Sequence, residues 1–184
     1  MSESRLAQLK TLMQKSTGGA KRSVWSLAAA TYGARPDDET TIPTGFDPHL
    51  VALFEAMIGA AILVAHADGH FDEVERRALE QVVHNLGDGS LPRGQVVTLV
   101  EDFEAELARD GFEKRVQLVI DAVIRPDFAR ELLRVAAVVA LASHDVSIEE
   151  RTLLDRFAVG MGLDATLVDD VITEVRAAIP QTGS

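Results

Sequence analysis

Two stretches of the sequence repeat one pattern at a spacing of 75 residues. The segment that starts at Ile62, ILVAHADGHFDEVERRALEQVV, aligns with the segment that starts at Ala137, AVVALASHDVSIEERTLLDRFA. Each copy combines an apolar run, a short polar loop and a stretch whose apolar residues have helical spacing. Such a unit has an apolar face that it cannot cover alone, and two units can bury these faces against each other. The repeat therefore predicts an all-α fold, a helical bundle of two pseudo-symmetric helix-loop-helix repeats.

The helices that end near Ala65 and Ala142 are expected to lie at the centre of this bundle. Their apolar residues cover almost the whole circumference, and a helix without a polar face belongs inside a bundle. The second of them covers about 127–143. Apolar periodicity predicts further helices, separated by Gly and Pro residues, at about 72–86, 92–109, 112–125, 147–160 and 165–179.

Composition divides the chain into four parts. Residues 1–32 are a basic amphipathic N-terminal extension, in which apolar residues recur every three or four positions among basic ones (Leu6, Leu9, Leu12 and Met13 among Arg5, Lys10 and Lys15). Residues 33–46 contain Gly, Pro and Asp in a turn-rich pattern and are predicted to be a linker. Residues 47–180 form the helical domain, and residues 181–184 are expected to be a disordered tail.

The charge of the chain limits its partners. The net charge of −11 opposes binding to nucleic acid, whose affinity for proteins comes largely from Lys and Arg contacts to phosphates. Residues 1–35 carry a net charge of +5, which leaves −16 on the remainder. We therefore expect the basic segment to dock on the acidic body of its own chain. The alternative is peripheral contact of residues 1–32 with an anionic membrane surface.

The absence of cysteine excludes disulfides, thiolate metal sites and thiol nucleophiles. The longest wholly apolar runs, residues 56–65 and 135–142, are shorter than the roughly 20 residues of a membrane-spanning helix. We expect a cytoplasmic protein, with contact to the inner membrane limited to its N-terminal extension.

The loop of the first repeat, residues 67–75, concentrates carboxylates where a helix begins. One interpretation is structural: Asp72 caps the helix, and Glu75 accepts a hydrogen bond from the backbone N–H of the capping residue. Ser147 and Glu150 fit the same capping box in the second repeat. The other interpretation is that Asp68, Asp72 and Glu75 also present oxygens to a hard divalent cation such as Ca²⁺ or Mg²⁺. The loop lacks the spacing of an EF-hand, so binding at this loop is expected to be weak.

No set of catalytic residues accompanies these carboxylates. A hydrolase that used Asp68, Asp72 and His70 would lack a nucleophile and a phosphate-binding loop. The motifs HExxH and Glu-x-x-His, a P-loop and a Rossmann glycine pattern are all absent. His66 is predicted to be a bundle histidine that bonds to a neighbour, whereas His144 lies beside Asp145 in the second loop and is a weaker metal candidate. The chain is therefore expected to be non-enzymatic.

Residues 47–180 resemble the TerB family of tellurite-resistance and stress proteins. The resemblance is carried by Ala67-Asp68-Gly69, followed by an apolar residue, a cap and a glutamate, and by a degenerate second copy in the same helical chain. It implies a helical bundle of two pseudo-symmetric halves, with acidic residues around both loops that are associated with divalent metal.

By this resemblance Asp68, Asp72 and Glu75 match the first metal motif, and Glu150 matches the glutamate of the second. The second loop departs from the pattern, because Ser143-His144 replaces Asp-Gly and the carboxylate of Asp145 is displaced by two positions. Asp145 and Glu150 are therefore the metal ligands that the resemblance implies for the second loop.

The resemblance also implies a function: a non-enzymatic, divalent-cation-binding scaffold in bacterial tellurite resistance and stress response. The implied partners are proteins, including a TerC-like membrane protein. The alternative left open by the degenerate second loop is a metal-independent protein–protein interaction module.

Overall fold

Helices make up the regular structure of the computed structural model, which describes residues 11, 24–33, 47–69, 71, 73–86, 91–143 and 145–178. Within these residues there are helices and loops and no strand, so the predicted all-α fold is confirmed. The pseudo-symmetry of the two halves stays a prediction. In chain order the helices are α2 (Val24–Gly33), α3 (Pro48–Ala65), α4 (Glu73–Leu86), α5 (Arg93–Asp110), α6 (Phe112–Ala122), α7 (Pro126–Ser143), α8 (Ile148–Gly160) and α9 (Thr166–Ala178).

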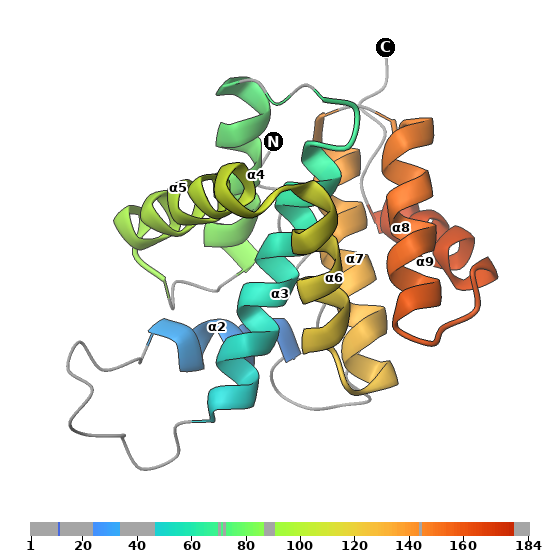
Figure 1. The fold of residues 1–184 in the computed structure, drawn as a ribbon, viewed down its shortest axis with the longest axis horizontal. Coiled ribbons are helices and arrows are strands. Elements are labelled where there is room, and N and C mark those ends of the chain that lie inside the picture. Colours follow the sequence, from blue (N-terminus) through green and yellow to red (C-terminus); the bar gives the residue numbers. More distant parts are fainter. Residues whose placement is uncertain are drawn as a thin grey trace.

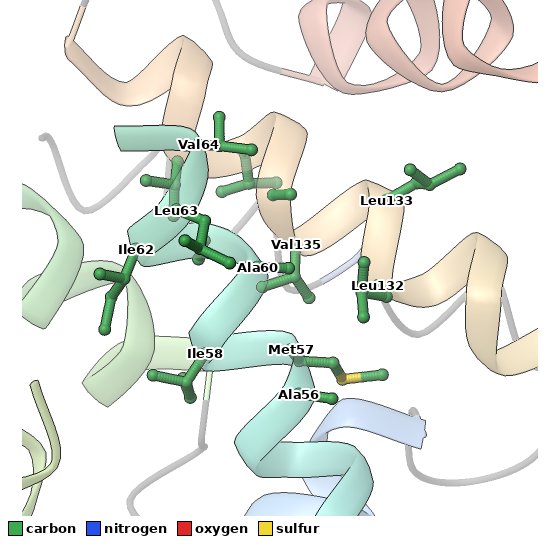
Figure 2. Packing of buried hydrophobic residues seen from close by; sticks show 14 of the residues in the cluster. Ala56, Met57, Ile58, Ala60, Ile62, Leu63, Val64, Leu132, Leu133 and Val135 are labelled. Carbon is green, nitrogen blue, oxygen red and sulfur yellow. The ribbon is translucent and has the colours of Figure 1, made fainter. Parts of the chain in front are cut away.

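Helices α3 and α7 pack against each other at the centre of the bundle (Figure 1). Met57, Ile58 and Ile62 of α3 are at most 1% exposed, and every residue of α7 from 131 to 140 is buried. Figure 2 shows the side chains of Ala60 and Val135 between the two helices. The prediction that the helices ending near Ala65 and Ala142 are central is therefore confirmed.

Local signals explain how α3 begins and why its neighbours approach it closely. The Asp47 side chain caps the helix by accepting a hydrogen bond of 2.9 Å from the His49 backbone N–H, and Pro48 suits the first helical position. At Gly59 a Cβ atom would lie only 3.2 Å from side-chain atoms of both Phe103 and Val119. The missing side chain therefore lets α5 and α6 pack directly on α3.

The remaining helices surround this central pair. In Figure 1, α4 and α5 lie on one side and α8 and α9 on the other, while α6 runs beside α3. Helix α2 packs against α3, with Ala28 and Ala29 fully buried and the Tyr32 ring 5.0 Å from that of Phe54. The other residues of the predicted extension, except Thr11, lie outside the described residues, as do residues 34–46 of the linker and the tail.

Helix α6 ends at Ala122, three residues before the predicted end at residue 125. Val123 leaves the helix with an extended backbone (φ −104°, ψ 100°), and its side chain is 8% exposed. Pro126 then occupies the first position of α7, and a proline disfavours helical geometry in the residue before it. The apolar spacing alone does not reveal this early turn into the core.

The first half of α7 buries two charged residues that the apolar pattern did not single out. Glu131 is 1% exposed and Arg134 is 5% exposed. The Arg134 guanidinium donates hydrogen bonds to Glu174 of α9 (2.7 Å) and to Glu131 (3.4 Å). A charge in such a position needs a partner, because its removal from water is costly. This network joins α7 to α9.

In the described ranges, α3 alone is long and apolar enough to span a membrane by length and composition. Its 18-residue window has a mean hydropathy of 1.9, but 67% of that window is buried inside the protein. A core helix passes the same test, so this property is a weak indication of a membrane span. In this fold α3 serves as the central core helix.

Candidate metal centre

The first repeat loop follows α3, and His66, which lies between the two, is held by contacts to its neighbours. The Nδ1 atom of His66 lies 2.8 Å from the Ile62 carbonyl oxygen, and the ring centroid lies 4.3 Å from that of Phe71. The backbone then turns at Gly69, whose φ of 81° belongs to the left-handed region that favours glycine. His66 is therefore a bundle histidine bonded to a neighbour, as predicted. Asp68 is exposed between these two residues.

The second repeat loop contains the complete capping box that the sequence predicted. The Glu150 backbone N–H donates to Ser147 Oγ (3.1 Å), and the Ser147 backbone N–H donates to Glu150 Oε2 (2.7 Å). The equivalent box of the first repeat stays a prediction, because Asp72 lies outside the described residues, as do His70 and His144.

Replacing Ser147 with alanine is expected to lower the free energy of unfolding by about 0.5–2 kcal/mol, because the first turn of α8 loses its side-chain acceptor. Urea denaturation measures this difference. Thr152→Ala is the matched control: its hydroxyl bonds to the Ile148 carbonyl in the middle of the helix, where such bonds contribute little. Equal losses in the two variants would contradict the capping role.

Glu75 and Glu150, which occupy the same position in the two repeats, line one small cavity of about 10 Å³. Its other walls are Ala65, Ala78, Leu79 and Val139. Burial raises the pKa of Glu150 above its ordinary value of 4.5, and the negative charges of Asp68 and Glu75 raise it further. Two predicted ligands of the first loop are therefore close enough to Glu150 of the second loop for their charges to act on it.

The motifs predicted two separate half-sites, one in each loop, and did not predict that Glu75 and Glu150 meet at one cavity. The signal was nevertheless available. Positions that are equivalent in two packed repeats can meet at the axis between them, and these glutamates are related by the 75-residue shift.

Asp145, the displaced carboxylate of the second loop, has a different partner. Its Oδ1 atom lies 2.5 Å from Nη2 of Arg176 in α9 and accepts a hydrogen bond of 3.0 Å from the Val146 backbone N–H. The Arg176 hydrogen bond is the main reason that the pKa of Asp145 is lowered. The Asp145 carboxylate is thus paired with the guanidinium of Arg176 in α9. Its role as a metal ligand stays a prediction.

The donor types suit a hard cation, but the described side chains do not form a finished ligand shell. Carboxylate oxygens are the ligands that Ca²⁺ and Mg²⁺ prefer. Among the residues that the structure describes, no group of three or more His, Asp or Glu side chains is arranged to hold a metal ion. Asp72, which would contribute a further carboxylate, lies outside this set.

The raised pKa of Glu150 gives a prediction for the pH dependence of stability. A carboxyl whose pKa is raised on folding stabilises the fold below its ordinary pKa, and this contribution is lost as the pH rises through the raised value. Glu150→Gln keeps an acceptor for the capping box and removes the charge. The stability of the variant relative to the wild type should therefore increase from about pH 4 to about pH 7.

Urea denaturation at both pH values measures this change. Glu149→Gln is the matched control, since it removes an exposed carboxyl from the same helical turn. A relative stability of Glu150→Gln that does not change with pH would contradict the expected effect of burial.

The comparison with known families agrees with this arrangement of helices and loops. The family model described as "Tellurite resistance protein TerB" matches residues 54–171, well over half of the chain. The match includes both repeat loops, the whole of α7 and the part of α3 from Phe54 onward. No curated protein and no solved structure matches the chain. The extent of the family match shows that this chain belongs to the TerB family.

Proposed function

We propose that this TerB-family chain is a non-enzymatic scaffold in bacterial tellurite resistance and stress response, and that it responds to a divalent cation. The proposed binding site is the small cavity of Glu75 and Glu150, called the acidic pocket below, with Asp68 and Asp72 as further ligands. The observation that carries the proposal is the meeting of Glu75 and Glu150, from the two repeats, at one cavity. The negative charges of Asp68 and Glu75, in addition to burial, raise the pKa of Glu150.

A bound cation would reduce the repulsion that Asp68 and Glu75 exert on Glu150. Two negative charges that act on a half-buried third one make its ionised form costly, and a bound Ca²⁺ or Mg²⁺ would reverse the sign of that interaction. Because the ion requires ionised ligands, its binding should release protons and strengthen as the pH rises. Asp145 would join the site only by leaving Arg176.

Asp68→Ala is expected to weaken Ca²⁺ binding by about tenfold or more while leaving stability nearly unchanged, because Asp68 is exposed and has no part in the capping box. Calorimetric titration of the full chain with Ca²⁺ and with Mg²⁺ measures the affinity. Glu73→Gln is the matched control: this residue begins α4 but pairs with Arg77 on the surface.

Unchanged Ca²⁺ affinity in the Asp68 variant would remove this site from consideration. Asp72→Ala should differ from it by also losing about 0.5–2 kcal/mol of stability, as expected for a lost helix cap. The two variants therefore distinguish Asp68, which is proposed only as a metal ligand, from Asp72, which is proposed as a metal ligand and as a helix cap.

One observation favours a second function, a metal-independent interaction module. The Glu150 carboxylate already accepts a hydrogen bond from Ser147 in its capping box, and the second loop has Ser143-His144 where the family pattern has Asp-Gly. Under this alternative the carboxylates of the two loops contact a partner protein directly, without a bound cation. Titration of the folded chain with Ca²⁺ and with Mg²⁺ that gives no heat of binding would favour the metal-independent module.

For either function we propose protein partners, including a TerC-like membrane protein. The two functions differ in the conditions that association requires. Co-precipitation from membrane extracts, with Ca²⁺ or with a chelator, tests the difference, because a cation-responsive scaffold should lose its partner when the cation is removed. Association that is equal in both conditions would support the metal-independent module.

A further inference from the structure

A groove separate from the acidic pocket lies between α3, α5 and α6 and reaches the end of α2. Its volume is about 420 Å³. The floor is apolar and buried, formed by Ala56, Leu99, Phe103 and Val119. Leu118 lines the wall and is 45% exposed. The apolar surface that the groove exposes to solvent therefore lies on its walls, at Leu118, Ala52 and Ala122.

The rim of this groove is acidic. Glu55, Asp102 and Glu106 line it, together with the basic side chain of Arg115. Arg115 already has partners: its guanidinium lies 2.7 Å from a Glu106 carboxylate oxygen and 5.3 Å from the centre of the Phe103 ring. The rim therefore keeps a net negative charge, and the segment that fits it is apolar on one face and basic at its edges.

We propose that this groove is the docking site for the basic N-terminal segment of the same chain, residues 5–15. Apart from Thr11, this segment lies outside the described residues, so its fit is argued from its sequence. In a helix its leucines and Met13 form one stripe, and Lys10 and Lys15 flank that stripe on opposite sides. The stripe matches the exposed apolar side chains of the groove walls, and the two lysines match an acidic rim. Thr11, which lies opposite the stripe in such a helix, is helical and exposed.

The connection to α2 is long enough for this docking. Tyr32, near the end of α2, lines the groove, and it lies about 12 Å along the helix from Val24, where α2 begins. Residues 16–23 can extend over about 26 Å, and Gly18 and Gly19 permit a sharp change of direction. The segment can therefore return beside α2 and reach the groove. The inference does not depend on cation binding at the acidic pocket.

The absence of cysteine allows a direct test in the full chain by paired substitutions. Leu9→Cys with Leu118→Cys should form an intramolecular disulfide under mild oxidation at least ~10-fold faster than Leu9→Cys with Thr173→Cys. Thr173 is exposed on α9, which does not line the groove. Equal rates for the two pairs would overturn the proposal, and so would a disulfide that forms only between two molecules.

Charge reversal supplies a second measurement. Asp102→Lys should slow the disulfide of the Leu9–Leu118 pair about five-fold at low salt, and added salt should reduce this difference. Asp170→Lys is the matched control, because Asp170 is also exposed but lies on α9. A rate that is insensitive to Asp102→Lys would overturn the electrostatic fit. Strong binding of the wild-type chain to phosphatidylglycerol vesicles would show that the basic segment binds a membrane surface and not the groove. This result would also overturn the proposal.

Discussion

Arg134→Met is expected to lower the free energy of unfolding by about 3–5 kcal/mol, the range for removing one partner of a buried ion pair. The Arg134 side chain is 6% exposed and lies between Glu131, which is 1% exposed, and Glu174, which is 30% exposed. Methionine preserves the apolar volume and removes the charge. The Glu131 carboxylate would then remain buried without this cation, and α9 would lose its charged contact with α7.

Urea denaturation measures this effect, and two further variants identify its cause. Arg125→Met removes an exposed cation that lies 2.6 Å from Asp127, so it should cost less than about 1 kcal/mol. Adding Glu131→Gln to Arg134→Met should recover part of the loss, because the buried negative charge is then removed. Similar losses for Arg134→Met and Arg125→Met would show that burial does not decide the effect.

Phe54→Ala is expected to cost about 3–5 kcal/mol, because it removes a large side chain from the centre of the fold. Phe54 is 0% exposed in α3, and its ring lies 5.0 Å from that of Tyr32. The cavity left behind would also weaken the contact between α2 and α3. Amide exchange in α2 should therefore accelerate more than exchange in α8.

The control for this second variant is Ile148→Ala, which truncates an apolar side chain that is 82% exposed. Its effect should stay within about 0.5 kcal/mol. Denaturation curves of both variants give the comparison. If Phe54→Ala were as mild as Ile148→Ala, the central position of α3 in the core would be wrong.

Much of the local structure could be predicted from the sequence alone. The apolar spacing predicted the α3 and α7 helices and their central place, and Ser147 with Glu150 predicted a capping box that the structure confirms. His66 was expected to bond to a neighbour, and its partner, Ile62, is one helical turn away. These features depend on residues within a few positions of one another, which is why periodicity and capping rules reveal them.

The candidate site was predictable only in part. Asp68, Glu75 and Glu150 were identified as acidic residues of two loops, but the packing of the helices brings Glu75 and Glu150 to one cavity. Asp145 was grouped with them through the resemblance to the family motif, whereas in the fold its partner is Arg176, 31 residues away. A sequence pattern does not indicate which of two nearby charges a carboxylate will meet.

The sequence by itself therefore determined the helical class, the two central helices, the cap of α8 and the residue types around the loops, because neighbouring residues control each of these. Only the tertiary structure decided which side chains from distant parts of the sequence contact each other. Arg134 meets Glu174 from 40 residues away, and Val123 ends α6 early to enter the core. Both depend on the side chains that surround a position in space, since burial and charge pairing are set by the whole packed bundle.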